Sequence, residues 1–486
     1  MPKPDERRFS APRDSRRSAP PSAALAAVKA GVPHGAAETG WLPDLLYTGE
    51  AFEAGLAFFA DAQGRIVRFS REPADLAVAR RLEGQAVLPG IVTAHSHSFH
   101  RGFRGRGEQR ARVGAATADQ VLAALSEEDV FDAARMAFME MLLSGVTCVG
   151  EFLPLHRQPD GSPYPDPNHL SLAVLRAAHD VGIRISLLRA VHGPGDVPAA
   201  ARFRVPAIDD FVRETEALRE TVAREFPGDE AWLGIGAGSP ATVPLDQLKA
   251  LGTYARAQRL RLQVHVSATT GENEACVAAH GRTPIALLAE HGLVDKRFTA
   301  VDAAHLTDDE VKLLGAARTM VCLCPTSTLG AGHALPPIDA LLAAGAGVAL
   351  GTDANVQVDP LKEARLLEYH LRGLRGQRTG FANDPVAALF HAATVTGARS
   401  LGATGGALEV GRPADFFTVS LYDPSMVGSD PATLLANVMF SLERRAIRDV
   451  WVGARLRISN GRHVAHGAIV GRFADGQRRL WDATAG

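Results

Sequence analysis

The stretch IVTAHSH, residues 91–97, is an apolar run that ends in two histidines. Its β-branched start favours a strand, and because side chains alternate along a strand, His95 and His97 share one face. A strand that ends in polar residues and is followed by an amphipathic helical pattern is the unit of parallel α/β folds. The stretch therefore predicts the first strand of a repeated strand–helix arrangement.

The same alternation recurs along the chain to about residue 355. The strand candidates are residues 91–97, 146–152, 184–190, 232–238, 262–266, 298–304, 319–324 and 347–353. Eight such units predict a (β/α)8 TIM barrel. An open doubly wound sheet is the alternative, but its usual Gly-rich phosphate loop after the first strand is replaced here by the two histidines.

The segments on either side of the barrel are β-rich and contain Gly and Asn turns. We expect residues 41–87 and 406–470 to form one small β-sandwich domain built from both terminal segments. The barrel then spans residues 88–405, and residues 471–486 form a C-terminal extension. Residues 1–40, rich in Pro, Ser, Arg and Ala, are predicted to be a disordered tail, with a transit or export signal as the alternative.

The charge, the apolar stretches and the cysteine count of the chain argue against several classes of protein. The 486 residues carry a formal net charge of −2, so no global field favours nucleic acid or an anionic membrane surface. No apolar stretch approaches the length of a membrane span. Four cysteines in so long a chain do not make a disulfide framework and fit a reducing cytoplasm. We expect a cytoplasmic protein that acts on a small molecule, and the chain is consistent with a homodimer.

Further polar residues stand at the ends of later strands. His265 follows the fifth strand candidate and Asp353 ends the eighth, so both should meet His95 and His97 at the catalytic end of the barrel. Each has an ordinary alternative, a core histidine for His265 and a helix N-cap for Asp353. Three imidazoles and one carboxylate together predict a site for one divalent metal ion, Zn²⁺ or alternatively Fe²⁺.

A family resemblance covers residues 41–470. VLPGIVTAHSHSFHRG resembles the first-strand motif of the amidohydrolase superfamily, and the order His-x-His, His, Asp is similar to its mononuclear deaminase branch. Within that superfamily, HSHSFHRG, EFLPLHRQPDGSPYPDP and GTDANVQVDPLKEARLLEYHLRGLR resemble the formimidoylglutamate deiminases. The resemblance implies a metal-dependent hydrolase that acts on a non-peptide C–N bond.

Several positions depart from the pattern of that family. The proton-shuttling glutamate three residues after the fifth-strand histidine is Ala268, and the sixth-strand histidine is Asp302. The segment that holds the substrate's carboxylates in formimidoylglutamate deiminases reads GSPA, residues 238–241. His100 stands where a glutamine is expected and Pro154 where a tyrosine is expected.

Three explanations of these departures remain open. The first is an enzyme with a changed substrate, in which Asp353 accepts the proton of the attacking water and Asp302 delivers it to the leaving amine. The second is a catalytically impaired metal-binding pseudo-enzyme or partner protein. The third is non-hydrolytic chemistry on the same scaffold. Asp302 also has a structural alternative, a hydrogen bond to a neighbouring histidine such as His305.

Candidate substrate-binding residues lie in the loops after the strands. They are His100, Arg101, Arg104, His156 and His305. The arginines crowd the loop after the first strand and could attract an acidic substrate, although a solvated loop is the alternative. Glu272, seven residues after His265, is interpreted as a solvated helix start.

Overall fold

The computed structural model describes residues 38–105, 115–193, 200–205, 207–226 and 228–484. Residues 1–37 of the predicted tail lie outside this set. No described helix combines the length and the apolar character needed to cross a bilayer. All four cysteines are buried free thiols.

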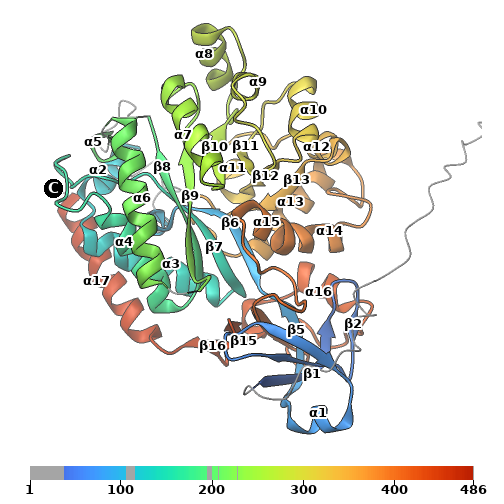
Figure 1. Cartoon of the computed structure of the whole chain (residues 1–486). Helices are drawn as coiled ribbons and strands as arrows, with labels where there is room; N and C mark the ends of the chain where they lie inside the picture. Colours follow the sequence, from blue (N-terminus) through green and yellow to red (C-terminus); the bar gives the residue numbers. More distant parts are fainter. Residues whose placement is uncertain (1–37, 106–114, 194–199, 206, 227, 485–486) are drawn as a thin grey trace, which may run out of the picture. The chain divides into compact units, whose positions relative to one another are not determined.

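Eight parallel strands form one sheet in chain order, which confirms the predicted barrel (Figure 1). The strands are β6 Ile91–Ser96, β7 Val146–Leu153, β8 Arg184–Val191, β9 Ala231–Ala237, β10 Leu262–Val266, β11 Phe298–Asp302, β12 Met320–Leu323 and β13 Gly347–Leu350. The strands are mostly apolar and buried because helices cover the outside of the sheet and side chains fill the inside. The last strand returns to the first through a parallel bridge between Ser96 and Asp353.

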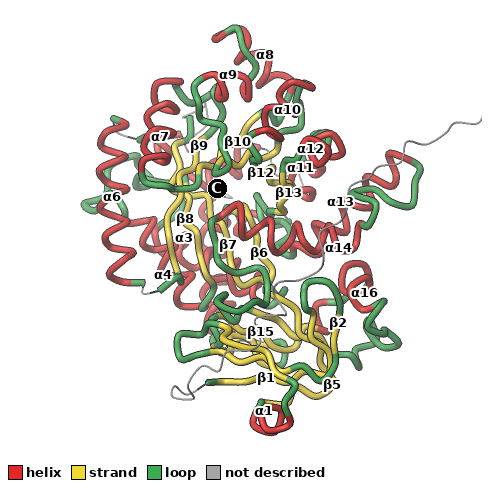
Figure 2. The backbone as a smooth tube through the Cα atoms, turned by 45° about the vertical axis from the view of Figure 1, so that its right-hand side comes forward, coloured by secondary structure: helices red, strands yellow, loops and turns green. Residues whose placement is uncertain are grey.

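Helices follow the barrel strands and cover the sheet from outside (Figure 2). The longer ones are α2 Ala115–Ala124, α3 Glu127–Leu142, α4 His169–Val181, α6 Ile208–Glu225, α7 Leu245–Ala257, α8 Thr270–His280, α10 Asp308–Ala316 and α13 Pro360–Arg375. The shorter ones are η1 Ser98–Phe103, α5 Ala200–Phe203, α9 Pro284–Glu290, α11 Pro325–Gly330, α12 Ile338–Ala344, α14 Pro385–His391, η2 Ala392–Thr396, α15 Gly397–Leu401, α16 Leu434–Phe440 and η3 Arg444–Ala446.

Strands from both ends of the chain form a second sheet, in the order β17-β16-β15-β14-β5-β1-β3-β4, with β2 beside β1. They are β1 Thr39–Tyr47, β2 Phe52–Glu53, β3 Ala57–Ala60, β4 Ile66–Ser70, β5 Arg80–Pro89, β14 Phe416–Ser420, β15 Ile447–Val452, β16 Arg455–Ser459 and β17 Arg462–His463, with α1 Pro73–Val78 between β4 and β5. Trp41, Phe58, Phe416 and Trp451 pack in its core with ring centroids 5.1–5.6 Å apart. Gly90 joins β5 to β6, where a Cβ atom would collide with the Thr147 side chain.

The C-terminal segment forms one helix, α17 His466–Thr484, so the sequence-based boundary at residue 470 falls inside a helix. Figure 1 shows α17 running beside α3, and the two helices are joined by ion pairs. Arg472 pairs with Asp132 and Glu128, both at 2.9 Å, and Arg479 pairs with Asp129 at 3.2 Å. Helix α17 is thereby packed on α3 and α2 of the barrel.

Candidate active site

Four side chains from three strand ends converge on one point. One ligand atom each from His95, His97, His265 and Asp353 lies within 4.8 Å of the others. The Nε2 atoms of His95 and His97 are 3.2 Å apart. Oδ1 of Asp353 is 3.5 Å from the first and 3.3 Å from the second. The structure therefore brings together all four of the residues that the sequence predicted as metal ligands.

Gln263 fixes the orientation of His95. The Gln263 side-chain amide donates a hydrogen bond from Nε2 to the Ala94 carbonyl, 2.9 Å away, which turns its Oε1 toward His95. Nδ1 of His95 donates to that oxygen at 3.0 Å. The lone pair of the neutral ring is then on Nε2, which faces the other ligands. Sequence analysis missed Gln263, although its position two residues before His265 on the same strand face was a usable signal.

Asp302 holds His265 in the same way. Oδ2 of Asp302 accepts a hydrogen bond from Nδ1 of His265 at 3.1 Å, so Nε2 of His265 is directed to the group. Burial alone would lower the pKa of His265, but this hydrogen bond and the charge of Asp302 raise it overall. The histidine bound by Asp302 is thus His265, whereas the sequence-based alternative named His305.

Asp353 occupies the loop that closes the barrel. Its backbone has a φ of +41°, and its carbonyl accepts the His97 N–H at 2.9 Å. Burial raises the pKa of Asp353, but its contacts with the His95 and His97 rings hold it well below its usual range. Gly351 allows this loop to lie close to His95. A Cβ atom at position 351 would lie 2.8–2.9 Å from Cys324 Sγ, Cys322 Sγ and His95 Cβ.

The donor set fits a divalent cation. Burial holds the pKa of His97 well below its ordinary value, so this imidazole is neutral and keeps a lone pair for a metal. Three imidazoles and one carboxylate at mutual ligand distances are the donors that divalent transition metals bind in proteins. The second nitrogens of His95 and His265 already have partners, as is usual for metal-bound histidines.

The two arginines predicted to bind substrate both contact groups of the protein. Arg101 is 7% exposed and makes a two-pronged ion pair with Glu140 of α3, with distances of 2.7 and 2.9 Å. Its Nη1 also donates to the carbonyls of Asn355 and Val356. Arg104 binds the same Glu140 at 3.1 Å. Both side chains thus bind one buried glutamate of α3, and substrate binding by Arg101 and Arg104 stays a prediction.

The predicted substrate-binding histidines lie in different surroundings. His100 packs on His97 with ring centroids 5.1 Å apart, and burial lowers its pKa to about 4. His156 is buried and donates from Nε2 to the Ala190 carbonyl at 2.8 Å, with a pKa lowered by burial to about 3. His156 thus belongs to the wall of the barrel rather than to a surface loop. The His305 main chain bonds to Ser267 and Asn273, which places this residue beside the loop after β10.

Glu272 is a polar residue near the site that sequence analysis misread. Its carboxylate turns back from the start of α8 and accepts the N–H groups of Ser267 and Ala268 at 2.7 and 2.8 Å. The Ser239 hydroxyl donates to it as well, at 2.5 Å. The pattern Thr269-x-x-Glu272 is a capping-box signal that could have shown the carboxylate turning toward the strand end.

The position and composition of this group define a class of protein. Catalytic groups of TIM barrels lie at the carboxyl ends of the strands, where His95, His97, His265 and Asp353 are found. A mixed imidazole and carboxylate set at that end is typical of metal-dependent hydrolases.

Comparisons with known proteins identify the family. The model described as "Amidohydrolase family" matches residues 86–464, and the chain belongs to this family. Formimidoylglutamate deiminase of Pseudomonas aeruginosa is 31% identical over 430 residues, covering 85% of this chain and 93% of the relative. A 5-methylthioadenosine/S-adenosylhomocysteine deaminase of Moorella thermoacetica is 27% identical, covering 77% of this chain and 82% of the relative.

Solved structures show the same fold. The crystal structure of an amidohydrolase from Brucella melitensis superposes with a TM-score of 0.81 at 25% identity, covering 91% of this chain and 100% of that chain. The structure of an adenosine deaminase from Xanthomonas campestris with bound zinc gives 0.77 at 22% identity, with 91% and 98% covered. The protein is therefore a hydrolase of the amidohydrolase type, and the pseudo-enzyme alternative is not favoured.

Proposed function

We propose that the protein hydrolyses a C–N bond of an amidine, an amide or an amino-substituted ring in a small molecule. One divalent ion, Zn²⁺ or alternatively Fe²⁺, would be held by His95, His97, His265 and Asp353. The convergence of these four ligand atoms within 4.8 Å carries the proposal. When bound, such an ion lowers the pKa of water to about 7 and so supplies the nucleophile at neutral pH.

Side chains of the protein would transfer the proton and position the metal ligands. Asp353 is ionised and lies beside the imidazoles, so it can accept the proton of the attacking water and return it to the leaving nitrogen. Asp302 was expected from the sequence to deliver that proton. Its Oδ2 is engaged with His265, so we assign it the role of a positioning residue. Glu272 holds the backbone of Ser267 and Ala268 and thereby the loop next to His265.

The substrate differs from the dicarboxylate formiminoglutamate in this proposal. Residues 238–241 carry no cationic side chain, and the Ser239 hydroxyl donates to Glu272. Arg101 is held by Glu140 and backbone carbonyls, so it cannot clamp a carboxylate without breaking that pair. An unpaired carboxylate in a closed site is costly, so substrates with fewer negative charges are favoured.

Metal analysis and an ammonia-release assay test the proposal. The protein loaded with Zn²⁺, Fe²⁺ or Mn²⁺ would be assayed on formiminoglutamate, guanidino, amide and aminopurine compounds. We expect about one metal ion per chain and release of ammonia from one of the less acidic compounds. His97→Ala should lose both the metal and turnover, while His280→Ala, on the exposed face of α8, should keep both. Turnover in metal-free His97→Ala, or a metal-loaded protein without activity on any compound, would contradict the proposal.

A further inference from the structure

A pocket lies at the opposite end of the barrel strands from the metal-binding group. Its volume is about 590 Å³, which is within the range of small-molecule sites. It opens where β9, β10 and β11 begin, beside the end of α6 and the turn after α15. Arg261 directly precedes β10, whereas His265 is near the far end of that strand, so the two sites are separated by the length of the strand.

The lining of this pocket is strongly cationic. Four arginines contribute to it, Arg219, Arg259, Arg261 and Arg297, and no aspartate or glutamate is among its lining residues. Arg219 is paired with Glu216 at 2.9 Å and Arg297 with Asp295 at 3.5 Å.

Arg259 and Arg261 lack such partners. Among the described residues, no carboxylate lies within 4.0 Å of either guanidinium group, and Arg261 donates only to the Lys296 carbonyl, at 3.2 Å. Burial lowers the pKa of Arg261, and the charges of Arg297 and Arg399 lower it further. Cations that repel one another beside a cavity indicate a site built for negative charge.

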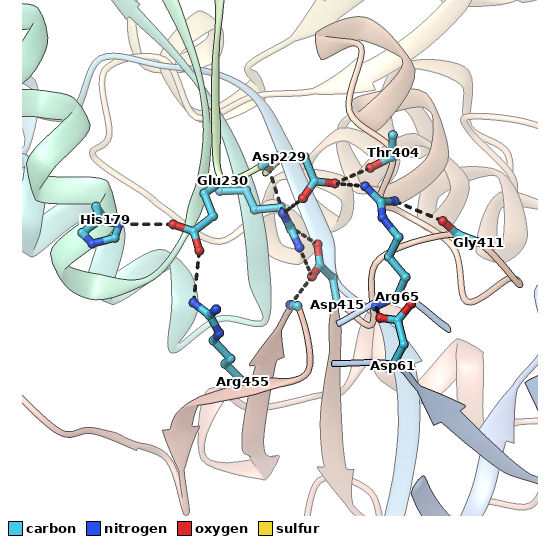
Figure 3. Close-up of polar contacts among 11 residues, drawn as sticks. Asp61, Arg65, His179, Asp229, Glu230, Thr404, Gly411, Asp415 and Arg455 are labelled. Carbon is cyan, nitrogen blue, oxygen red and sulfur yellow. Dashed lines mark hydrogen bonds and ion pairs between the residues drawn. The ribbon is translucent and has the colours of Figure 1, made fainter. Parts of the chain in front are cut away.

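Asp229 and Glu230, which lie between the lining residues Gly228 and Ala231 in the chain, are already paired with cations (Figure 3). Asp229 borders an adjoining cavity and binds Arg65 at 3.1 Å, Arg184 at 2.5 Å and the Thr404 hydroxyl at 3.0 Å. Glu230 binds Arg455 at 3.1 Å and His179 at 3.2 Å, as Figure 3 also shows. These acids therefore do not compensate Arg259 and Arg261, the two lining arginines that have no carboxylate partner among the described residues.

The remaining wall of the pocket is apolar and aromatic. Phe226, Leu233, Leu260 and Leu401 contribute to it together with the ring of Trp232. The indole N–H of Trp232 donates to the Leu401 carbonyl at 2.8 Å, so the ring offers the pocket a surface for packing rather than a hydrogen bond. Such a wall suits a ligand with a flat or apolar body.

We infer that this pocket binds a small organic phosphate of the nucleotide type, with its phosphates on Arg259, Arg261 and Arg297 and its base against Trp232. Guanidinium groups bind phosphate oxygens in pairs of hydrogen bonds, and aromatic rings stack on nucleobases. The site is separate from the metal-binding group and does not depend on the reaction catalysed there.

The inference is tested by adding ADP to the metal-loaded full chain. Tryptophan fluorescence and titration calorimetry would measure the binding. We expect saturable binding that quenches the fluorescence and weakens as salt is raised. The quench should disappear in Trp232→Phe. Pyrophosphate and adenosine, each half of the probe, should both bind at least tenfold more weakly than ADP.

Arginine variants locate the site. Arg261→Gln and, separately, the exposed Arg259→Gln should each weaken ADP binding about tenfold or more, since each removes a charged hydrogen-bond donor. Arg213→Gln makes the same charge change on an exposed part of α6 and should leave binding unchanged. Melting temperatures would verify folding, and Arg259→Gln serves if Arg261→Gln does not fold. No binding of ADP at millimolar concentration, equal binding by the arginine variants, or equal binding of pyrophosphate or adenosine would overturn the inference.

Discussion

The side chain of Gln263 decides which nitrogen of His95 faces the metal-binding group. Its amide is fixed by the Ala94 carbonyl, so only its oxygen is presented to His95. Gln263→Leu would remove this acceptor and leave the ring free to change its tautomer. We expect metal affinity to fall about 10–100-fold with the fold retained, as is usual when a partner of a metal-bound histidine is lost.

Competition with a chromogenic chelator would measure that affinity. Gln85→Leu is the matched control, because Gln85 lies in β5 of the terminal sheet and its Oε1 has no hydrogen-bond partner. Equal metal affinity in Gln263→Leu and the unmodified protein would show that Gln263 does not orient His95.

The four residues of the metal-binding group were predictable because position along a strand sets the direction of a side chain. His95, His97, His265 and Asp353 stand at the ends of apolar runs, and parallel strands bring those ends together. The partners of Arg101 and Glu272 were not predictable in this way. They depend on how a helix or loop turns back to the strand, as Glu140 and the Ser267–Ala268 backbone show.

At the scale of elements, Arg101 connects η1, α3 and the loop after β13. It binds Glu140 and two backbone carbonyls of the loop that follows Asp353. Arg101→Met should lower the free energy of unfolding by about 3 kcal/mol, because a buried ion pair loses one partner. Arg104→Met is the control and should cost less than about 1 kcal/mol, since this side chain is 37% exposed.

Urea unfolding of both variants would measure the difference. The result also distinguishes the structural role of Arg101 from the substrate-binding role that the sequence suggested. A raised KM with unchanged stability in Arg101→Met would support the substrate-binding role of Arg101 and contradict the structural role.

Glu363 makes the contact between α13 and α11 sensitive to pH. It is fully buried, its Oε2 accepts the Thr326 N–H at 2.8 Å, and burial raises its pKa to about 8. The unfolded chain releases this proton near pH 4.3, so between about pH 4 and 8 the folded state binds more protons than the unfolded state. This group therefore stabilises the fold fully at low pH, and the contribution is lost as pH rises to 8.

Glu363→Gln keeps the acceptor and removes the titration. We expect the unfolding free energy of the variant to decline less between pH 5 and 8 than that of the unmodified protein, as measured by urea unfolding at each pH. Glu443→Gln serves as an exposed control and should follow the unmodified protein. Parallel curves for Glu363→Gln and the unmodified protein would show that Glu363 is ionised in the fold.

At the scale of the whole molecule, strands that precede the barrel and strands that follow it meet in one sheet. The β-rich composition of residues 41–87 and 406–470 was enough to expect this pairing. The strand order was not predictable. Strand β5 pairs in parallel with β1, and it also pairs antiparallel with β14, which lies more than 300 residues further along the chain. Such registers are set by long-range packing rather than by any local pattern.

Arg184 forms ion pairs where this sheet contacts the barrel. The contribution of these ion pairs to stability should decrease in acid. Arg184 begins β8 and binds Asp415 of the loop before β14 at 2.7 Å and Asp229 at 2.5 Å. Burial raises the pKa of Asp229, but Arg184 and neighbouring donors lower it more, so the net shift is downward. A carboxylate with a lowered pKa stabilises the fold above its unfolded value of about 3.9, and that contribution is lost as pH falls below it.

Asp229→Asn should therefore be less stable than the unmodified protein at pH 7, and the difference should shrink as the pH approaches 3. Thermal unfolding followed by circular dichroism at each pH would show it. Asp339→Asn removes a 66% exposed carboxylate that pairs with Arg375 and should change the melting temperature little at either pH, because solvent screens this carboxylate. A difference between Asp229→Asn and the unmodified protein that stays constant from pH 7 to 3 would mean that the charge of Asp229 does not hold the sheet to the barrel.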